Sequence, residues 1–218
     1  DGGSDTLYGG TGDDLISGGD GRDLLVAGTG VDTLVGGDGN DTYFAGSGDT
    51  ITETGGAGLD VVMASDSFTL GANIENLFIN EAGVFNATGN SLDNLISGNS
   101  QSNILIGGAG ADTLSGGAGD DTLSGGAGAD RLDGCANGDV FIGSSSELAN
   151  DTIAVFDSAD AIVVTGTDLS ALNGQAAASV ISTGAGSLSI EAFSGPANAR
   201  FEATFSGGDT TIRLTDPP

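Results

Sequence analysis

The amino-acid sequence predicts an all-β protein, a parallel β-solenoid that ends in a C-terminal β-rich cap. Two observations lead to this prediction. Aspartates recur every nine residues in two separate series, with glycines at fixed positions before each aspartate and a large apolar residue two positions after it. From residue 143 onward glycine becomes less frequent, and short segments alternate apolar with polar residues, as half-buried strands do. A repeat of fixed length is typical of solenoids, in which each repeat packs on its neighbours.

The nine-residue period occupies two arrays. The first contains Asp5, Asp14, Asp23, Asp32 and Asp41; the second contains Asp112, Asp121, Asp130 and Asp139, and its register extends upstream to Asn94 and Asn103. A single further copy at 55–63 carries Asp60. The apolar residues two positions later are expected to point into the core: Leu7, Ile16, Leu25, Leu34, Tyr43, Ile96, Leu105, Leu114, Leu123, Leu132 and Phe141.

Each repeat reads G-G-x-G-x-D-x-U-x, where U is apolar. Glycine adopts positive φ without a Cβ penalty, so we expect the first six residues to form a turn that aims its carbonyls at one point, and the last three to form a short strand. The aspartate directs its carboxylate at the same point. The glycines of the clean copies, which would shape these turns, are Gly9, Gly10, Gly12, Gly18, Gly19, Gly21, Gly36, Gly37, Gly39, Gly107, Gly108, Gly110, Gly116, Gly117, Gly119, Gly125, Gly126 and Gly128.

Two repeats make one coil of 18 residues, so a turn stacks on the turn two repeats later. Asp5, Asp23 and Asp41 should therefore line one edge of the solenoid, and Asp14 and Asp32 the other. Hard divalent cations take carboxylate and carbonyl oxygens as ligands. The aspartates of the arrays, Asp60 and the turn glycines are therefore the candidate metal-binding residues, and we expect calcium between stacked turns, roughly six to eight ions in all.

Composition excludes several functions. The chain carries 31 acidic and 4 basic residues, a net charge of −27, and it has no His. Nucleic acid is excluded as a partner because a polyanion requires basic side chains. Catalysis through Ser-His-Asp or Cys-His groups and His-ligated zinc are excluded by the absence of histidine. One Cys allows no internal disulfide, and no apolar run is long enough for membrane insertion. Bound cations would relieve the self-repulsion of such a chain.

The nonapeptides resemble the RTX, or hemolysin-type, calcium-binding repeats of bacterial proteins exported by type I secretion. The copies at 9–17, 18–26, 36–44, 107–115, 116–124 and 125–133 carry this resemblance. It implies a parallel β-roll that folds in extracellular calcium, a secreted or cell-surface location, and an uncleaved C-terminal export signal. Asp1 stands at the second position of a repeat, so we expect an upstream domain in a larger parent protein.

Four segments are expected: a first array at 1–44, an irregular spacer at 45–88, a second array at 89–142, and a cap or secretion-related region at 143–218. The spacer resembles sequences found between RTX arrays. It would either continue the solenoid without full metal turns, which we favour, or form a loop packed against the roll. In the repeats at 89–106, Asn94 and Asn103 replace aspartate, and we expect stacked amides there in place of metal.

The cap contains five candidate strands, at 151–156, 160–165, 187–194, 200–206 and 210–215, with a hairpin turn at Gly207, Gly208 and Asp209. Asp168 could cap a short helix at 169–173. Cys135 occupies the second glycine position of its repeat, either as a tolerated substitution, which we favour, or as a reactive thiol.

These features favour a non-catalytic calcium-binding module that folds after export and stabilises a larger parent, which could carry an upstream catalytic domain. Two alternatives remain open at this point. One is a calcium-rigidified surface protein, such as an S-layer or adhesin segment. The other is the tail of a polysaccharide-modifying enzyme that holds glycans through calcium. Calcium-dependent assembly would favour the first, and calcium-dependent retention on acidic polysaccharide would favour the second.

Overall fold

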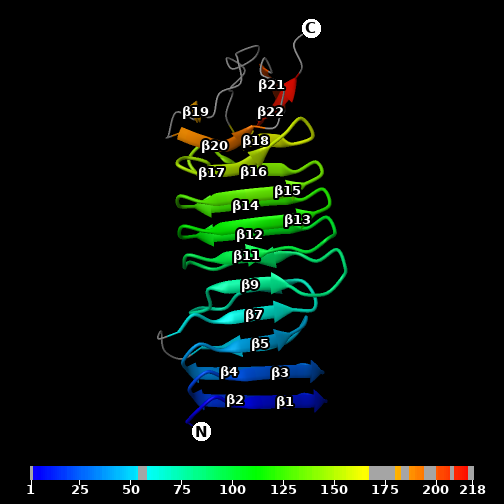
Figure 1. Cartoon of the computed structure of the whole chain (residues 1–218), viewed down its shortest axis with the longest axis vertical. Helices are drawn as coiled ribbons and strands as arrows, with labels where there is room; N and C mark the ends of the chain where they lie inside the picture. Colours follow the sequence, from blue (N-terminus) through cyan, green and yellow to red (C-terminus); the bar gives the residue numbers. More distant parts are fainter. Residues whose placement is uncertain are drawn as a thin grey trace.

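The computed structural model describes residues 2–53, 58–166, 180–182, 187–193, 200–206 and 209–215. Its regular elements are all strands, stacked in sequence order from the N-terminal coil through residue 165 (Figure 1). Among these described residues, no helix is long and apolar enough to cross a membrane. The predicted all-β parallel solenoid is therefore confirmed.

One wall of the solenoid is a single sheet, parallel throughout except at its last pair. Its order is β1-β3-β5-β7-β9-β11-β13-β15-β17-β20-β19. The strands are β1 (Thr6–Thr11), β3 (Leu24–Thr29), β5 (Thr42–Ala45), β7 (Val61–Ala64), β9 (Asn76–Ile79), β11 (Leu95–Ser97), β13 (Thr113–Ala118), β15 (Arg131–Ala136), β17 (Thr152–Phe156), β20 (Ser187–Phe193) and β19 (Val180–Ser182).

The other wall consists of two sheets. The smaller one contains β2 (Leu15–Asp20), β4 (Thr33–Asp38) and β6 (Thr50–Thr52). The larger one has the order β21-β22-β18-β16-β14-β12-β10-β8. Its strands are β21 (Arg200–Ser206), β22 (Asp209–Thr215), β18 (Ala161–Thr165), β16 (Val140–Ser144), β14 (Thr122–Ala127), β12 (Ile104–Ala109), β10 (Ala87–Thr88) and β8 (Phe68–Thr69).

The register between coils is 18 residues within the arrays, as the period predicts. Thr6 pairs with Leu24 in β1 and β3, and Thr113 pairs with Arg131 in β13 and β15. The predicted strand length is wrong, however. Array strands such as β13 span six residues, the last three of one repeat and the first three of the next. The glycine pair extends the strand because its backbone pairs with the coil 18 residues away, as Gly117 does with position 135.

The spacer contributes strands to this stack. β7 pairs in parallel with β5 on one side and with β9 on the other, and β9 pairs with β11. The spacer strands of the first wall thus pair with strands of both arrays. In the second wall the ladder stops at β6 and resumes at β8.

The core is a single column of apolar side chains between the walls. The residues at the U positions are buried from Leu25 to Phe141, whereas Leu7 in the first coil is only partly buried. Spacer residues continue the column, among them Val62, Ile74 and Leu77. Val84, by contrast, is exposed and lies outside any strand.

The cap keeps the parallel pattern for one further coil and then changes it. β17 pairs in parallel with β20, but β18 pairs antiparallel with β22, and β22 antiparallel with β21. Ser206 lies opposite Asp209, as a tight hairpin requires. The turn residues 207–208, the predicted helix at 169–173 with Asp168, and residues 55–57 of the isolated repeat lie outside the described residues.

Candidate metal centres

The repeat aspartates form two ladders along the edges of the solenoid. One carboxylate oxygen, Oδ1, accepts a hydrogen bond from the backbone N–H of the aspartate 18 residues earlier in the chain. Asp5 N–H donates to Asp23 at 2.8 Å, and Asp23 N–H donates to Asp41 at 2.8 Å. On the opposite edge Asp14 N–H donates to Asp32 at 2.8 Å. The expected division of the aspartates between the two edges is thus confirmed.

The other oxygen of these carboxylates, Oδ2, is buried and accepts no hydrogen bond. This holds among the described residues for Asp14, Asp23, Asp32, Asp41, Asp112, Asp121, Asp130 and Asp151. An unpartnered buried carboxylate oxygen is unfavourable, because the charge loses water and gains nothing in return. A calcium ion bound to these oxygens would remove that penalty, so the residues present fit the metal that the sequence suggests.

The first glycine of a repeat leaves room at the point where such oxygens meet. A Cβ on Gly107 would overlap Oδ2 of Asp112 and would lie 2.5 Å from the carbonyl oxygen of Gly125 in the next coil. A Cβ on Gly116 would similarly meet Asp121 Oδ2 and lie 2.9 Å from the Gly134 carbonyl oxygen. A carboxylate and a carbonyl oxygen from stacked turns therefore converge there, and both are calcium ligands of the usual kind.

Burial strongly affects the protonation of the ladder carboxyls. Burial, the largest cause, and the charges of Asp130 and Asp93 together raise the pKa of Asp112 to about 6, against the lowering effect of the hydrogen bond from Asn94 N–H. Burial also raises the pKa of Asp139 to about 7 and that of Asp151 to about 7. Without a cation, the folded arrays thus oppose the charged form of their own aspartates.

In the asparagine turns, the side chain at the aspartate position makes its hydrogen bonds to protein groups. Asn94 Oδ1 accepts the N–H of Asn90 at 2.8 Å, and its Nδ2 donates to the carbonyls of Ile74 at 3.1 Å and Glu75 at 3.2 Å. Asn103 Nδ2 donates likewise to the Phe85 carbonyl at 2.6 Å. Each amide thus binds the preceding coil directly, and that these turns at 89–106 hold no metal stays a prediction.

A second asparagine reinforces each of these turns. Asn90 Nδ2 donates to the carbonyls of Gly71 and Ile74, both at 2.7 Å. Asn99 Nδ2 donates to the carbonyls of Glu81 at 2.7 Å and Gly83 at 3.0 Å. Asn90 and Asn99 stand at the second position of their repeats, which glycine fills in the clean aspartate repeats. The additional donors are therefore a feature of the asparagine turns.

Four ladder carboxylates escaped the sequence analysis because no glycine motif precedes them. Asp32 N–H donates to Asp49 at 2.9 Å, and Asp60 N–H donates to Glu75 at 2.9 Å. Asp130 and Asp139 N–H donate to Asp151 and Asp160, both at 2.9 Å. The available signal was the acidic residue two positions before a core residue, as in Asp49–Ile51 and Asp151–Ile153.

These additional carboxylates differ in their second oxygen. The Oδ2 of Asp49 accepts the N–H of Gly46 at 2.8 Å, and that of Asp160 accepts the N–H of Asp157 at 2.8 Å. Both turns are therefore closed by their own backbone. Asp151 Oδ2 has no partner, as in the repeats, so Asp151 is a further candidate ligand at the start of the cap.

The last repeat tolerates two departures from glycine. Cys135 and Asn137 take the second and fourth glycine positions with φ of 72° and 87°. Asp139 still joins the ladder, since its Oδ1 accepts the N–H of Asp121 at 2.9 Å. Cys135 is exposed, and its Sγ lies 3.3 Å from Ser115 Oγ. The substitution is thus accommodated in the turn, as favoured from the sequence.

Comparison with protein families identifies these arrays. The model of the RTX calcium-binding nonapeptide repeat matches four times, at residues 1–34, 17–51, 88–123 and 106–141. A comparison with curated proteins finds no match. The four matches cover the two arrays that carry the ladders of buried aspartates. Residues 1–51 and 88–141 therefore match the hemolysin-type RTX calcium-binding repeat, and the structure folds the described residues of both ranges as a parallel β-roll.

Proposed function

We propose that this chain is a calcium-triggered folding module of a secreted bacterial protein. Before export, in low calcium, the charge of −27 keeps the chain extended. Extracellular calcium then binds between stacked turns, so that binding and folding are one event. The folded module supports secretion and stabilises a larger parent protein, which carries its activity in another domain. The module itself takes no part in catalysis.

The observation that carries this proposal is the row of buried, unpartnered Oδ2 atoms along both edges. The proposed ligands are the aspartates of the arrays and Asp60, together with backbone oxygens of the turns shaped by the repeat glycines. Roughly six to eight calcium ions would bind, if each ion joins two stacked turns. They would bring roughly 12–16 positive charges and offset about half of the net charge.

The thin core makes the metal necessary in this proposal. Each nine-residue repeat buries one large side chain, such as Leu114 or Leu123. Fixing nine residues opposes folding by on the order of 1–2 kcal/mol for each residue, more than one apolar side chain recovers. Calcium binding supplies the remaining free energy.

Far-UV circular dichroism during a calcium titration, after exhaustive chelation, tests the proposal. We expect a cooperative transition from coil to β-structure near millimolar calcium, the range typical of extracellular modules. Magnesium at the same concentration should leave the chain unfolded, because it demands a smaller and more rigid octahedral site. A β-spectrum that survives chelation at neutral pH would contradict calcium-triggered folding.

A further inference from the structure

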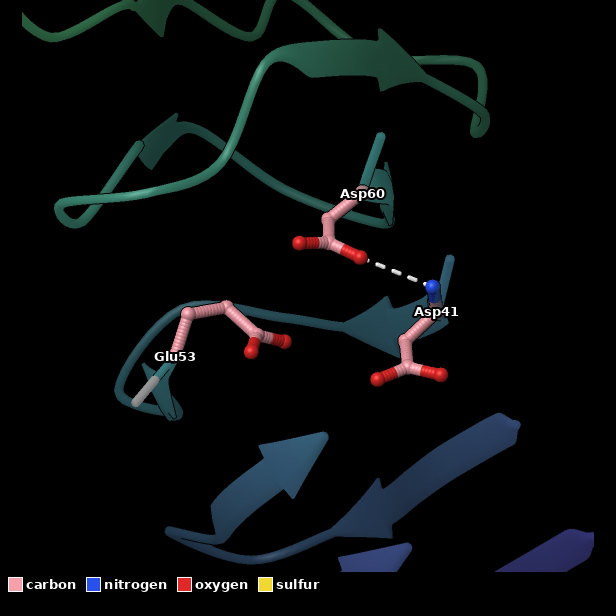
Figure 2. A group of neighbouring side chains, drawn as sticks. All are labelled: Asp41, Glu53 and Asp60. Carbon is pink, nitrogen blue, oxygen red and sulfur yellow. Dashed lines mark hydrogen bonds between the residues drawn. The ribbon is translucent and has the colours of Figure 1, made fainter. Parts of the chain in front are cut away.

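Three carboxylates meet where the first array joins the spacer. Asp41 ends the first array, whereas Glu53 and Asp60 come from the spacer, and their carboxylates lie in one region of the solenoid interior (Figure 2). One oxygen from each lies within 4.8 Å of the other two. Ligands at 2.3–2.6 Å from one calcium ion are at most about 5 Å apart, so this spacing fits a shared ion.

A buried oxygen without a partner points into this cluster. Asp41 is fully buried, and its Oδ2 accepts no hydrogen bond. A Cβ placed on Gly36 would overlap that oxygen, Glu53 Oε1 and the Tyr43 hydroxyl. Oxygens of three side chains thus converge on one point beside a glycine.

This convergence differs from that in the ordinary repeats. Beside Gly107 and Gly116, the Asp oxygen is joined by a backbone carbonyl of the next coil. Beside Gly36, the carboxylate of Glu53 occupies the corresponding place. Glu53 lies in the spacer, outside the residues matched by the repeat family. A charged oxygen has therefore replaced a neutral one, which increases the attraction for a cation.

The protein groups around Glu53 do not neutralise it. Burial, and after it the charges of Asp60, Asp41 and Glu75, raise the pKa of Glu53 to about 7. Its hydrogen-bond partners are neutral, namely the Tyr43 hydroxyl and the N–H of Gly37. Buried carboxylates in such numbers need a cation or must bind protons.

We propose that Asp41, Glu53 and Asp60 form a calcium site that closes the first array, with the Tyr43 hydroxyl as the positioning group for Glu53. The site rests on the proposed function, because the arrays must fold around calcium before it can form. It adds an ion of its own and fixes the spacer to the last repeat of the first array.

The number of bound ions tests this site directly. Glu53→Gln removes one charge with little change in size, and Glu81→Gln is the matched control, since Glu81 is an exposed residue of the same spacer. Native mass spectrometry of the full chain in calcium should show one ion fewer for E53Q and an unchanged number for E81Q. An unchanged number for E53Q would overturn the site.

Terbium luminescence locates the missing ion. The chain has two tyrosines, Tyr8, which is exposed, and Tyr43, which is buried beside Glu53. In a Tyr8→Phe background, terbium emission excited through tyrosine reports ions near Tyr43. We expect E53Q to lower this emission severalfold, and E81Q to leave it unchanged. Equal emission from both variants would contradict the proposed position.

A conservative variant separates a lost ligand from a lost fold. Glu53→Asp keeps the charge but shortens the side chain, so it should fold in calcium and weaken one ion at least severalfold. Unweakened binding in E53D, with E53Q unable to fold, would assign Glu53 a structural role and overturn the site. If the unsubstituted chain binds no calcium, the proposed function fails. If the unsubstituted chain binds calcium and E53Q binds the same number of ions, only this site fails.

Discussion

The turns at 107–142 and those at 89–106 stack in the same ladders but differ in backbone and in chemistry, since φ is positive at Gly108 and Gly110 but not at Asn90 and Leu92. In the former, Asp112 and Asp121 leave a buried oxygen without a partner. In the latter, Asn94 and Asn103 close the same position with amide hydrogen bonds to the preceding coil. Coils thus pair in parallel with either kind of turn. Calcium dependence can therefore vary along a single solenoid.

The comparison points to a seam of amide hydrogen bonds between the spacer and the second array. The seam consists of Asn90, Asn94, Asn99 and Asn103, whose amides bind carbonyls of the spacer coils. In the folded chain these amides join the spacer to the second array without a metal ligand. The seam also gives the fold a segment from which the neighbouring coils can propagate.

Exchange of the seam amides for carboxylates should have the largest effect. In N94D/N103D the Nδ2 donors to Ile74, Glu75 and Phe85 are lost, and two buried acids appear. We expect the calcium-loaded chain to lose about 2–6 kcal/mol of stability, because three amide hydrogen bonds are lost and two carboxyls are buried in their place. Amide hydrogen exchange of residues 87–106 in saturating calcium would measure the loss. Protection in the variant equal to that in the unsubstituted chain would contradict the seam.

The next largest effect is expected in the pH dependence of the calcium-free chain, which acts on the aspartate turns and not on the asparagine turns. The folded pKa values of Asp112, Asp139 and Asp151, about 6, 7 and 7, lie above the ordinary value of 3.8. Their contribution to stability is therefore fully present below about pH 4 and is lost as the pH rises through 6 to 7.

In chelator we accordingly expect β-structure by circular dichroism at pH 4–5 and its loss by pH 7.5. Saturating calcium should reverse this trend, because its ligands must be deprotonated. A calcium-free chain that is more stable at pH 7.5 than at pH 5 would contradict the burial of these carboxyls.

The reciprocal exchange should have a smaller effect. In D112N/D121N the amides remove two charges, and each could donate to carbonyls as the seam amides do. We expect fewer bound calcium ions by native mass spectrometry and a smaller shift of the thermal midpoint between chelator and calcium. Exchange of the outward Asp20 and Asp38 for asparagine is the control, since both are exposed. Equal ion counts in the two double variants would remove Asp112 and Asp121 from the proposed ligands.

The smallest effect is expected at the irregular last turn. Cys135 holds φ at 72°, where a side chain is strained and glycine is not. Cys135→Gly should therefore stabilise the calcium-loaded chain by about 1 kcal/mol in denaturant unfolding. Cys135→Ala retains the strain and should gain nothing. A gain from alanine equal to that from glycine would attribute the effect to the thiol and not to the backbone.

The sequence by itself determined the repeating part of this protein. The nine-residue period predicted the 18-residue register, the column of residues from Leu25 to Phe141, and the division of aspartates between two edges, all of which the structure has. The physical reason is that each repeat contacts only its neighbours, so a local pattern is sufficient to place it.

Only the tertiary structure decided the places where the period fails. Asp41 and Asp60 are 19 residues apart and Asp60 and Glu75 are 15 apart, yet all three belong to one ladder. The length of a coil can vary as long as its strands pair, so spacing cannot reveal such partners. The six-residue strands and the approach of Glu53 to Asp41 likewise depend on contact between coils. These contacts arise when the chain stacks on itself, and the local sequence does not record them.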